Sequence, residues 1–212
     1  MKIIRYLVAA ILLSLISLGG AVQAQSSSIV DLEYVKAAQQ RGVIIWDVRA
    51  SNQYLEGHIP GAINVGDIGT ALRDPNREDF IDLAEINSIF NKVGLDINKE
   101  IIVYGSRGNP YAYFGLFTIN YFGGKQAKVF HDGMDGWAQA NLAIERTPST
   151  LASISVQLVP QDNLVVTNEQ MRKLYNNQSV QVVDVRTFNE FKGNDVRAIR
   201  GGHIPGAVSI PY

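Results

Sequence analysis

The sequence contains no cysteine among its 212 residues. This absence excludes disulfide bonds, metal sites built on thiolates and a cysteine nucleophile within the chain. An excess of charge of one sign is also missing, because 19 basic residues face 20 acidic ones and the formal net charge is −1. The balanced charge and the lack of a basic run give no reason to expect a nucleic-acid partner. We predict no metal site and no cofactor.

The first 24 residues have the features of a secretory signal peptide. Lys2 and Arg5 give a basic start, residues 6–18 are apolar, and small residues precede Gln25, where cleavage is expected. The apolar run is short for a membrane span, although an uncleaved anchor helix is the alternative. We therefore expect an exported protein without a stable membrane anchor after cleavage. The periplasm is the simplest destination if the source is a Gram-negative bacterium.

The rest of the chain contains one pattern twice. In each copy an apolar stretch ends in Asp-Val-Arg, an aromatic residue follows, and Gly-His-Ile-Pro-Gly-Ala leads into another apolar stretch. Asp47 and His58 of the first copy correspond to Asp184 and His203 of the second, which indicates a duplicated domain. The Asp-to-His spacing is 11 residues in the first copy and 19 in the second, so eight extra residues fall at 193–200.

Strand and helix patterns alternate along the first copy, which predicts an α/β fold with a mostly parallel sheet and right-handed crossovers. Ligand sites in such sheets lie at the carboxyl ends of the strands. Asp31 is expected to cap the first helix. The predicted helices cover residues 32–40, 80–93, 110–122 and the surroundings of Trp137, and the predicted strands cover 43–46, 62–65, 101–104 and 128–131.

The domain boundaries follow from the repeat. We predict a first domain at residues 25–144, a linker at 145–163 and the start of a second domain at 164–212, where Thr167 opens a capping box and a strand follows at 180–184. A domain that stops after its second strand leaves a sheet edge unpaired and apolar helix faces uncovered. We therefore expect the chain to be an incomplete copy of a longer protein.

These motifs resemble the rhodanese family. The resemblance is carried by both Asp-Val-Arg and both Gly-His-Ile-Pro-Gly-Ala motifs, by the strand at 101–104 with its glycine-containing loop, and by Val-Phe-His-Asp-Gly-Met-Asp-Gly-Trp at 129–137. It covers residues 30–212. It implies rhodanese-like three-layer units with a mostly parallel central sheet. Tandem members of this family are thiosulfate or 3-mercaptopyruvate sulfurtransferases in which only the C-terminal unit is catalytic.

The resemblance also implies a nucleophile. In the family a cysteine after the central strand takes up a sulfane sulfur as a persulfide and passes it to a thiophilic acceptor such as cyanide or a thiol. Backbone N–H groups of the loop and the dipole of the following helix lower the pKa of a thiol placed there. Gly105 holds the matching position in the first unit, which is therefore expected to be non-catalytic. Arg107 of the same loop either binds an anion or stays solvated.

Two Asp–Arg pairs and two histidines recur at matching positions of the repeat. Each pair either orients the active loop or ties a strand end to a neighbouring loop, since a paired buried charge is costly to separate. Each histidine is a candidate general base, but its place in a Pro-Gly turn favours a hydrogen bond to the backbone. These residues are Asp47 with Arg49, Asp184 with Arg186, His58 and His203.

An anionic sulfur donor such as thiosulfate or mercaptopyruvate needs cations. Arg186, Arg197 and Arg200 are the candidates in the second unit, and tandem rhodaneses carry a longer segment beside the catalytic pocket where the last two lie. Glu190 stands where some family members have a substrate-binding arginine. The expected partners are a small anionic sulfur donor and a thiophilic acceptor. The alternative is a non-catalytic rhodanese-like binding module; a phosphatase would need a larger cysteine-containing loop than the one at Gly105.

The spacing within the first unit also places the missing nucleophile. Gly105 follows Asp47 by 58 residues, and the same interval from Asp184, lengthened by the insertion, ends near position 250. We predict that the longer gene encodes, within about ten residues of that position, an apolar strand ending in cysteine, a short glycine-containing loop and a helix start. Sequencing the locus beyond Tyr212 checks this. A complete second unit without cysteine in that loop would favour the binding module.

Overall fold

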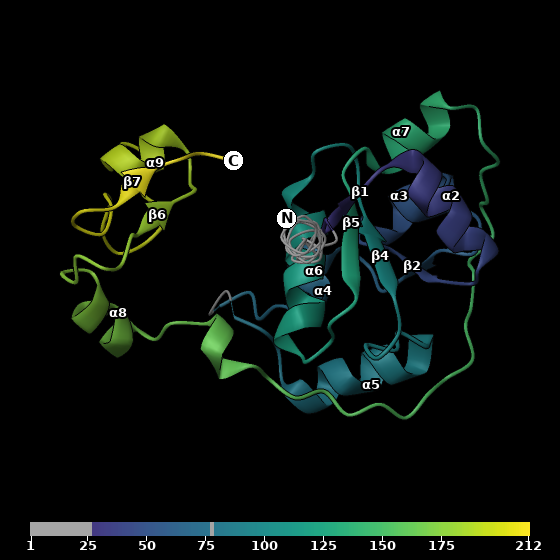
Figure 1. Cartoon of the computed structure of the whole chain (residues 1–212), viewed down its shortest axis with the longest axis horizontal. Coiled ribbons are helices and arrows are strands. Elements are labelled where there is room, and N and C mark those ends of the chain that lie inside the picture. The colour runs from purple at the N-terminus through teal and green to yellow at the C-terminus, as the bar shows by residue number, and fades with distance from the viewer. Residues whose placement is uncertain (1–26, 77–78) are drawn as a thin grey trace, which may run out of the picture.

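The computed structural model describes residues 27–76 and 79–212 (Figure 1). The predicted signal peptide at residues 1–24 lies outside the described residues. Within the described ranges, no helix has the length and apolar character needed to cross a membrane.

A five-stranded sheet forms the centre of the first unit, and all of its paired strands are parallel. The strands, in their spatial order, are β1 (Ile29–Val30), β5 (Ala127–Phe130), β4 (Ile101–Tyr104), β2 (Ile44–Asp47) and β3 (Ile63–Asn64). Every residue of β2 and β4 is buried, as expected for the interior of a parallel sheet that is covered on both faces.

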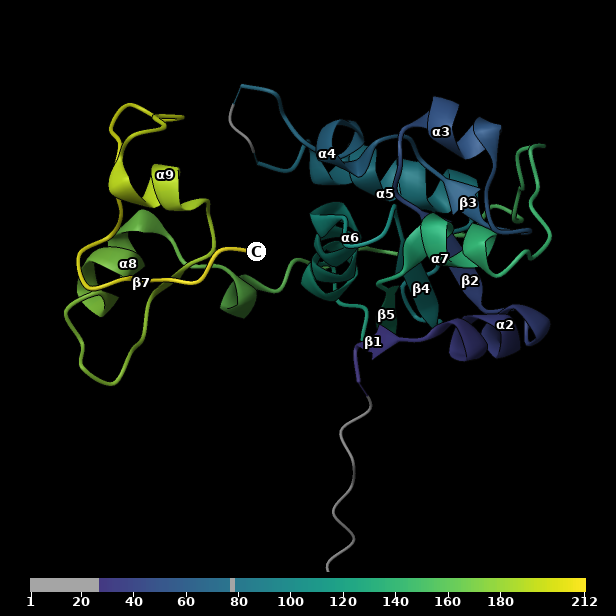
Figure 2. The same ribbon diagram turned by 90° about the horizontal axis from the view of Figure 1, so that it is seen from above.

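Helices cover both faces of this sheet, so the unit has three layers (Figures 1 and 2). The helices of the first unit are α2 (Leu32–Gln40), α3 (Ser51–Glu56), α4 (Ile68–Ala71), α5 (Leu83–Val93), α6 (Pro110–Tyr121) and α7 (Gly133–Gln139). Successive strand residues point to opposite faces. Trp46 and Val103 therefore join a core with Phe90 of α5, whereas Ile45 and Ile102 join a separate core with α2 and α7.

Local chemistry sets the helix boundaries. The predicted helix over residues 32–40 is confirmed, and the Asp31 side chain accepts a hydrogen bond from Tyr34 N at 2.8 Å. The helix predicted from residue 80 begins instead at Leu83, because Asp82 caps it by accepting from Ala84 N. The short helices α3 and α4 were not predicted, because they are too short to show a helical period.

The second part of the chain contains a small parallel sheet in which Val183 pairs with Val208. Its elements are η1 (Asp162–Leu164), α8 (Asn168–Leu174), β6 (Val183–Asp184), α9 (Phe188–Lys192) and β7 (Val208–Ser209). The capping box predicted at Thr167 is present, and Thr187 with Glu190 forms another. Of the strand predicted at residues 180–184, only the last two residues form a strand, which is β6. Val183, Val208 and Ile210 are exposed, so this sheet has no covering layer over them.

The segment between the two sheets runs along the outside of α5, below that helix in Figure 1. Two asparagines one helical turn apart hold its backbone. Val156 N donates to Asn91 Oδ1 and Leu158 N donates to Asn87 Oδ1, both at 2.8 Å. Both asparagine amide groups also donate to Val156 O. The linker around Val156 and Leu158 is therefore fixed to α5 by bonds that involve no ionisable group.

A buried ion pair ties the end of β2 to the turn that follows α3. Arg49 Nη2 lies 2.6 Å from Asp47 Oδ2 and 2.8 Å from Gly57 O. The Asp47 side chain is 0% exposed and that of Arg49 is 8% exposed. Burial opposes the charge of the guanidinium, but the hydrogen bonds and charge of Asp47 outweigh it and raise the pKa of Arg49.

The second copy repeats this ion pair at the surface. Arg186 Nη2 lies 2.6 Å from Asp184 Oδ2 and 2.8 Å from Gly202 O. The Arg186 side chain is 45% exposed, however, so water competes for the same groups. The chain thus contains the same Asp–Arg ion-pair geometry twice, once buried and once exposed to solvent.

We predict that Asp47→Asn lowers the free energy of unfolding of the first unit by about 3–5 kcal/mol, because it leaves the Arg49 charge buried without a counter-charge. Asp184→Asn removes the same charge from the exposed copy and should change stability little. Urea unfolding followed by the fluorescence of Trp46 and Trp137 and by circular dichroism measures both. Equal losses of unfolding free energy in the two variants would contradict the conclusion that burial makes the Asp47–Arg49 pair the more important one.

Candidate functional site

The carboxyl edge of the five-stranded sheet gathers the sequence motifs of the first unit. Tyr104 ends the central strand, and its hydroxyl accepts a hydrogen bond from Ile59 N at 3.0 Å. The Arg49 guanidinium lies 5.8 Å from the centre of the Tyr104 ring. Burial, with the charge of Asp47 added, raises the pKa of Tyr104 well above its usual value. Both sequence motifs therefore meet at the end of the strand that precedes Gly105.

The loop from Gly105 to Asn109 is closed by partners from within the protein. Arg107 N donates to Asp135 Oδ2 at 2.7 Å, and Gly108 N donates to His131 O at 3.0 Å. The Asn109 side chain accepts from Tyr111 N and so caps α6. Arg107 N and Gly108 N are thus already bonded within the protein, and Arg107 N is bonded to a carboxylate.

Gly105 itself is buried, yet its position has room for a side chain. A Cβ placed on Gly105 would meet Asn109 Cβ at 3.4 Å, which is an ordinary contact. The opposite holds at Gly133, where φ is +55° and a Cβ would lie 2.2 Å from Gly105 O. The start of α7 therefore packs directly against the loop because residue 133 is a glycine.

Arg107 turns its side chain towards α7. Its Nε lies 3.3 Å from Asp132 Oδ1, and its Nη2 donates to Gln139 Oε1 at 2.9 Å. With the backbone bond to Asp135, residue 107 makes three contacts with the segment that follows β5. The guanidinium is thus engaged by the protein and is not aimed into the loop.

The two histidines of the repeat make the same local contacts. His58 Nδ1 lies 2.8 Å from Tyr54 O, and His203 Nδ1 lies 2.8 Å from Phe191 O. Each ring stacks on the aromatic ring of the residue that provides this carbonyl. His58 is 0% exposed, so in this structure it reaches no solvent-borne substrate. His203 is exposed because the second sheet lacks a covering layer.

Glu190 is committed to its own helix. Its Oε2 accepts from the Thr187 hydroxyl at 2.7 Å and from Thr187 N at 3.1 Å, while Arg197 Nε lies 3.6 Å from Oε1. The Thr187 bonds, followed by the charge of Arg197, lower the pKa of Glu190. This carboxylate therefore stays ionised and cannot replace a substrate-binding arginine.

The structure separates the two arginines of the insertion. Arg197 lines a cleft of about 440 Å³ together with Thr70 and Tyr111 of the first unit. Arg200 lines another cleft, of about 760 Å³, with Met171 and Ile199. Arg186 belongs to neither, because it is bound to Asp184 and Gly202 O. The three predicted donor-binding arginines are therefore not brought together in this structure.

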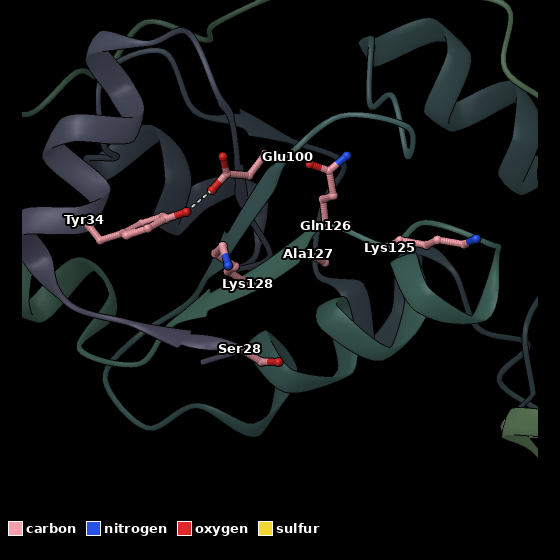
Figure 3. Close-up of a pocket in the computed structure, with 7 residues that line it drawn as sticks. All are labelled: Ser28, Tyr34, Glu100, Lys125, Gln126, Ala127 and Lys128. Carbon is pink, nitrogen blue, oxygen red and sulfur yellow. Dashed lines mark hydrogen bonds between the residues drawn. The ribbon is translucent and has the colours of Figure 1, made fainter. Parts of the chain in front are cut away.

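A further pocket, of about 320 Å³, lies at the opposite end of the sheet, where β4 and β5 begin (Figure 3). Tyr34 donates to Glu100 there, and this bond, with burial, raises the pKa of Tyr34. Lys128 lies over the Tyr34 ring at 5.4 Å. The pocket is remote from the Gly105 loop, at the edge where parallel sheets do not place their ligand sites.

Of three residues that shape these sites, Asp135 and Glu145 were not singled out from the sequence, and Tyr111 is predicted there only as a packing residue of its helix. Asp135 closes the Gly105 loop, Tyr111 faces Arg197 across a cleft, and Glu145 lies beside His58. Asp135 belongs to the Asp-Gly-Met-Asp-Gly-Trp segment, so its motif could have indicated it. Glu145 contacts a residue more than 80 positions away, and Tyr111 lines a cleft with a residue equally distant in the sequence, so neither carries a local signal. Within residues 27–76 and 79–212, no three His, Asp or Glu side chains are grouped to hold a metal ion.

The chain is similar to curated proteins. A thiosulfate sulfurtransferase of Corynebacterium glutamicum is 30% identical over 168 residues, which cover 74% of this chain and 55% of that protein. Other curated relatives, from mycobacteria, are 25–27% identical. The chain spans about half to three fifths of the length of these relatives.

Solved structures share the fold. SseA from Escherichia coli, a 3-mercaptopyruvate sulfotransferase by its description, superposes with a TM-score of 0.78 at 23% identity, over 88% of this chain and 75% of that one. The anaerobic ergothioneine biosynthesis enzyme of Chlorobium limicola gives a TM-score of 0.74 at 20% identity, over 87% of this chain and 50% of that one. At these identities the likeness shows the fold alone.

The family assignment rests on a match in both parts of the chain. Residues 31–140 and 167–212 match the Rhodanese-like domain. The first range holds every strand of the five-stranded sheet except the edge strand β1, and the second holds the small parallel sheet with the repeated Asp–Arg pair. By its motifs, its three-layer α/β fold and this match, the chain belongs to the rhodanese-like domain family.

Proposed function

We propose that this chain is part of a two-unit sulfurtransferase whose nucleophile is a cysteine of the second unit, outside the 212 residues. One observation carries the proposal. The second unit repeats the Asp–Arg and histidine contacts of the first, but only the first has a complete loop after its central strand, and that loop has Gly105 and is closed by Asp135. If the protein is an enzyme, its thiol belongs in the loop of the second unit.

The proposed chemistry is a double displacement. The cysteine thiolate attacks the sulfane sulfur of thiosulfate, the S–S bond breaks, and sulfite leaves with the bonding electron pair. With 3-mercaptopyruvate the C–S bond breaks instead, and the carbon of the leaving pyruvate takes up a proton. A thiophilic acceptor then attacks the outer sulfur of the persulfide and releases the thiolate. Cyanide leaves as thiocyanate, and no external oxidant or reductant is needed.

The anionic donor would enter the cleft between Arg197 and the first unit. Arg197 is 75% exposed in its side chain and lies 3.6 Å from both Glu190 and Asp195, so its ion pairs are open to water. Exposed pairs of this kind contribute little to stability, and an incoming anion can exchange with them. Thr70 and Tyr111 of the first unit line the same cleft.

The closed loop supports a non-catalytic role for the first unit, which would provide one wall of the donor cleft. We further propose that the protein is exported through the segment 1–24, with the periplasm as its destination in a Gram-negative bacterium. N-terminal sequencing of the mature protein tests this, because cleavage should leave Gln25 first. The proposed partners are the sulfur donor and the acceptor.

A non-catalytic binding module is the second candidate. It is favoured by the Gly105 loop, which has no thiol and whose Arg107 and Gly108 N–H groups are bonded within the protein. The two functions are distinguished by one residue. The sulfurtransferase requires a cysteine after the central strand of the second unit, whereas the binding module does not.

We predict that purified residues 25–212 form no thiocyanate from thiosulfate and cyanide, because they contain no thiol. The full-length parent should turn over, and a Cys→Ser variant of its second-unit loop should not. A colorimetric thiocyanate assay measures all three proteins. Turnover by residues 25–212, with contaminants excluded by mass spectrometry, would contradict the proposal. An inactive full-length parent would favour the binding module.

We also predict that Gly105→Cys folds, since its Cβ fits, but gives a poorly reactive thiol. The Asp135 carboxylate at the loop disfavours a thiolate there and occupies the Arg107 N–H. Adding Asp135→Asn should speed alkylation by iodoacetamide at neutral pH by about tenfold, equivalent to one unit of thiol pKa.

Asp132→Asn is the matched control for this experiment, because Asp132 pairs with the Arg107 side chain and not with the loop backbone. It should leave the alkylation rate of the Gly105→Cys variant nearly unchanged. Equal rates in Gly105→Cys with and without Asp135→Asn would show that Asp135 does not control this loop.

A further inference from the structure

The linker between the units lies against the first unit over residues 151–161, and we call this segment the strap. Gly94, just after α5, has a φ of +77°, and a Cβ there would lie 2.6 Å from Leu151 Cβ. The strap passes this close because residue 94 is a glycine. Further along, Ile154 N donates to Asn91 O at 3.0 Å. The first half of the strap is thus held at the C-terminal end of α5.

The second half of the strap is held at the C-terminal end of α6. Val159 N donates to Phe122 O at 3.2 Å, and Gln161 N donates to Tyr121 O at 2.7 Å. Between α5 and these bonds, the side chain of Leu158 enters the core of the first unit and is 3% exposed. The strap therefore behaves as part of the first unit up to residue 161.

Asn87 and Asn91 hold the middle of the strap. An asparagine side chain carries both an acceptor and a donor, so it can match the N–H and C=O groups of an extended chain. Each of the two asparagines uses both groups in this way, since each accepts from a strap N–H and donates to Val156 O. Together they provide the hydrogen bonds that a neighbouring strand would otherwise make.

The strap sets the length of the tether between the units. The helix α8 begins at Asn168, so residues 162–167 separate it from the end of the strap. Without the strap, the preceding contact is Ser149 N with the Tyr54 hydroxyl, and the tether would cover residues 150–167. The entropic cost of bringing two ends together rises with the logarithm of the tether length. A threefold longer tether lowers the effective concentration of one unit at the other about fivefold.

We infer that Asn87 and Asn91 are positioning residues that, by holding the strap, keep the second unit close to α6 and so raise the affinity of the cleft at Arg197 for its anion. The second unit lies on the α6 side of the first unit in both views (Figures 1 and 2). The helix α6 runs from the cleft, which Tyr111 lines, to Tyr121 at the end of the strap. The effect on anion affinity rests on the proposed function, whereas the effect on the distance between the units does not.

The distance between the units can be measured on the chain itself, because it contains no cysteine that would compete for a label. Gln53→Cys on α3 and Lys173→Cys on α8 place one exposed label in each unit. Double electron–electron resonance between spin labels at these positions gives the distribution of distances. Asn87→Ala with Asn91→Ala should broaden this distribution, because the released strap lengthens the tether.

The matched control is Ser88→Ala with Lys92→Ala, which has the same spacing on the exposed side of α5 and should leave the distribution unchanged. Leu158→Ala removes the apolar anchor of the strap without changing either asparagine, and it should also broaden the distribution. Circular dichroism and the fluorescence of Trp46 establish that each variant is folded. The inference is overturned if the asparagine and Leu158 variants keep the distribution of the unsubstituted chain, or if the control broadens it equally.

Thiosulfate binding tests the functional consequence. The apparent Kd of the chain for thiosulfate, followed by NMR at the Thr70 amide, should rise about fivefold in the asparagine variant and stay unchanged in the control. In the full-length parent the KM for the donor should rise by the same factor while kcat is nearly unchanged. An unchanged Kd despite a broadened distribution would overturn the positioning role. A broadened distribution without thiosulfate binding in the unsubstituted chain would uphold the strap and count against the donor cleft.

Discussion

The first unit is organised around the buried pair of Asp47 and Arg49. The carboxylate ends β2, the guanidinium reaches Gly57 O, and its face lies against the ring that ends β4. One ion pair thus connects two strand ends with the Gly-His-Ile-Pro-Gly turn. Such a pair is costly to break when buried, because either partner alone would be an uncompensated charge in a dry environment. The loop at Gly105 and the ring of His58 are held in place by this connection.

The two copies of the repeat share the geometry of their side-chain contacts but differ in how far those side chains are exposed to solvent. Both Asp–Arg pairs and both histidines make matching contacts, with several distances equal to a tenth of an ångström. In the first unit these groups are sealed under the linker and the helices, whereas in the second they face water. Identical contacts therefore carry different energies, because the dielectric surroundings decide how much an ion pair contributes.

The Gly105 loop and the cleft at Arg197 are two different places where an anion could bind. A carboxylate from α7 takes the backbone donor that an anion would need in the first loop. One cationic side chain that lines the cleft between the units, Arg197, comes from the insertion at 193–200, and Tyr111 lines the same cleft. A duplicated domain can lose its chemistry in one copy and retain a role as the wall of a shared cleft.

The sequence by itself determined the repeat, the parallel α/β fold and the bounds of elements such as the strand Ile101–Tyr104, because hydrophobic periodicity, caps and turn motifs are local. The resemblance of its motifs also predicted that Gly105 stands where the family has its nucleophile. Only the tertiary structure decided that Asp135 fills the loop, that Glu145 faces His58 and that Arg197 and Arg200 line different clefts. These contacts join distant positions through single side chains, and the burial that sets their strength exists only once both faces of the sheet are covered.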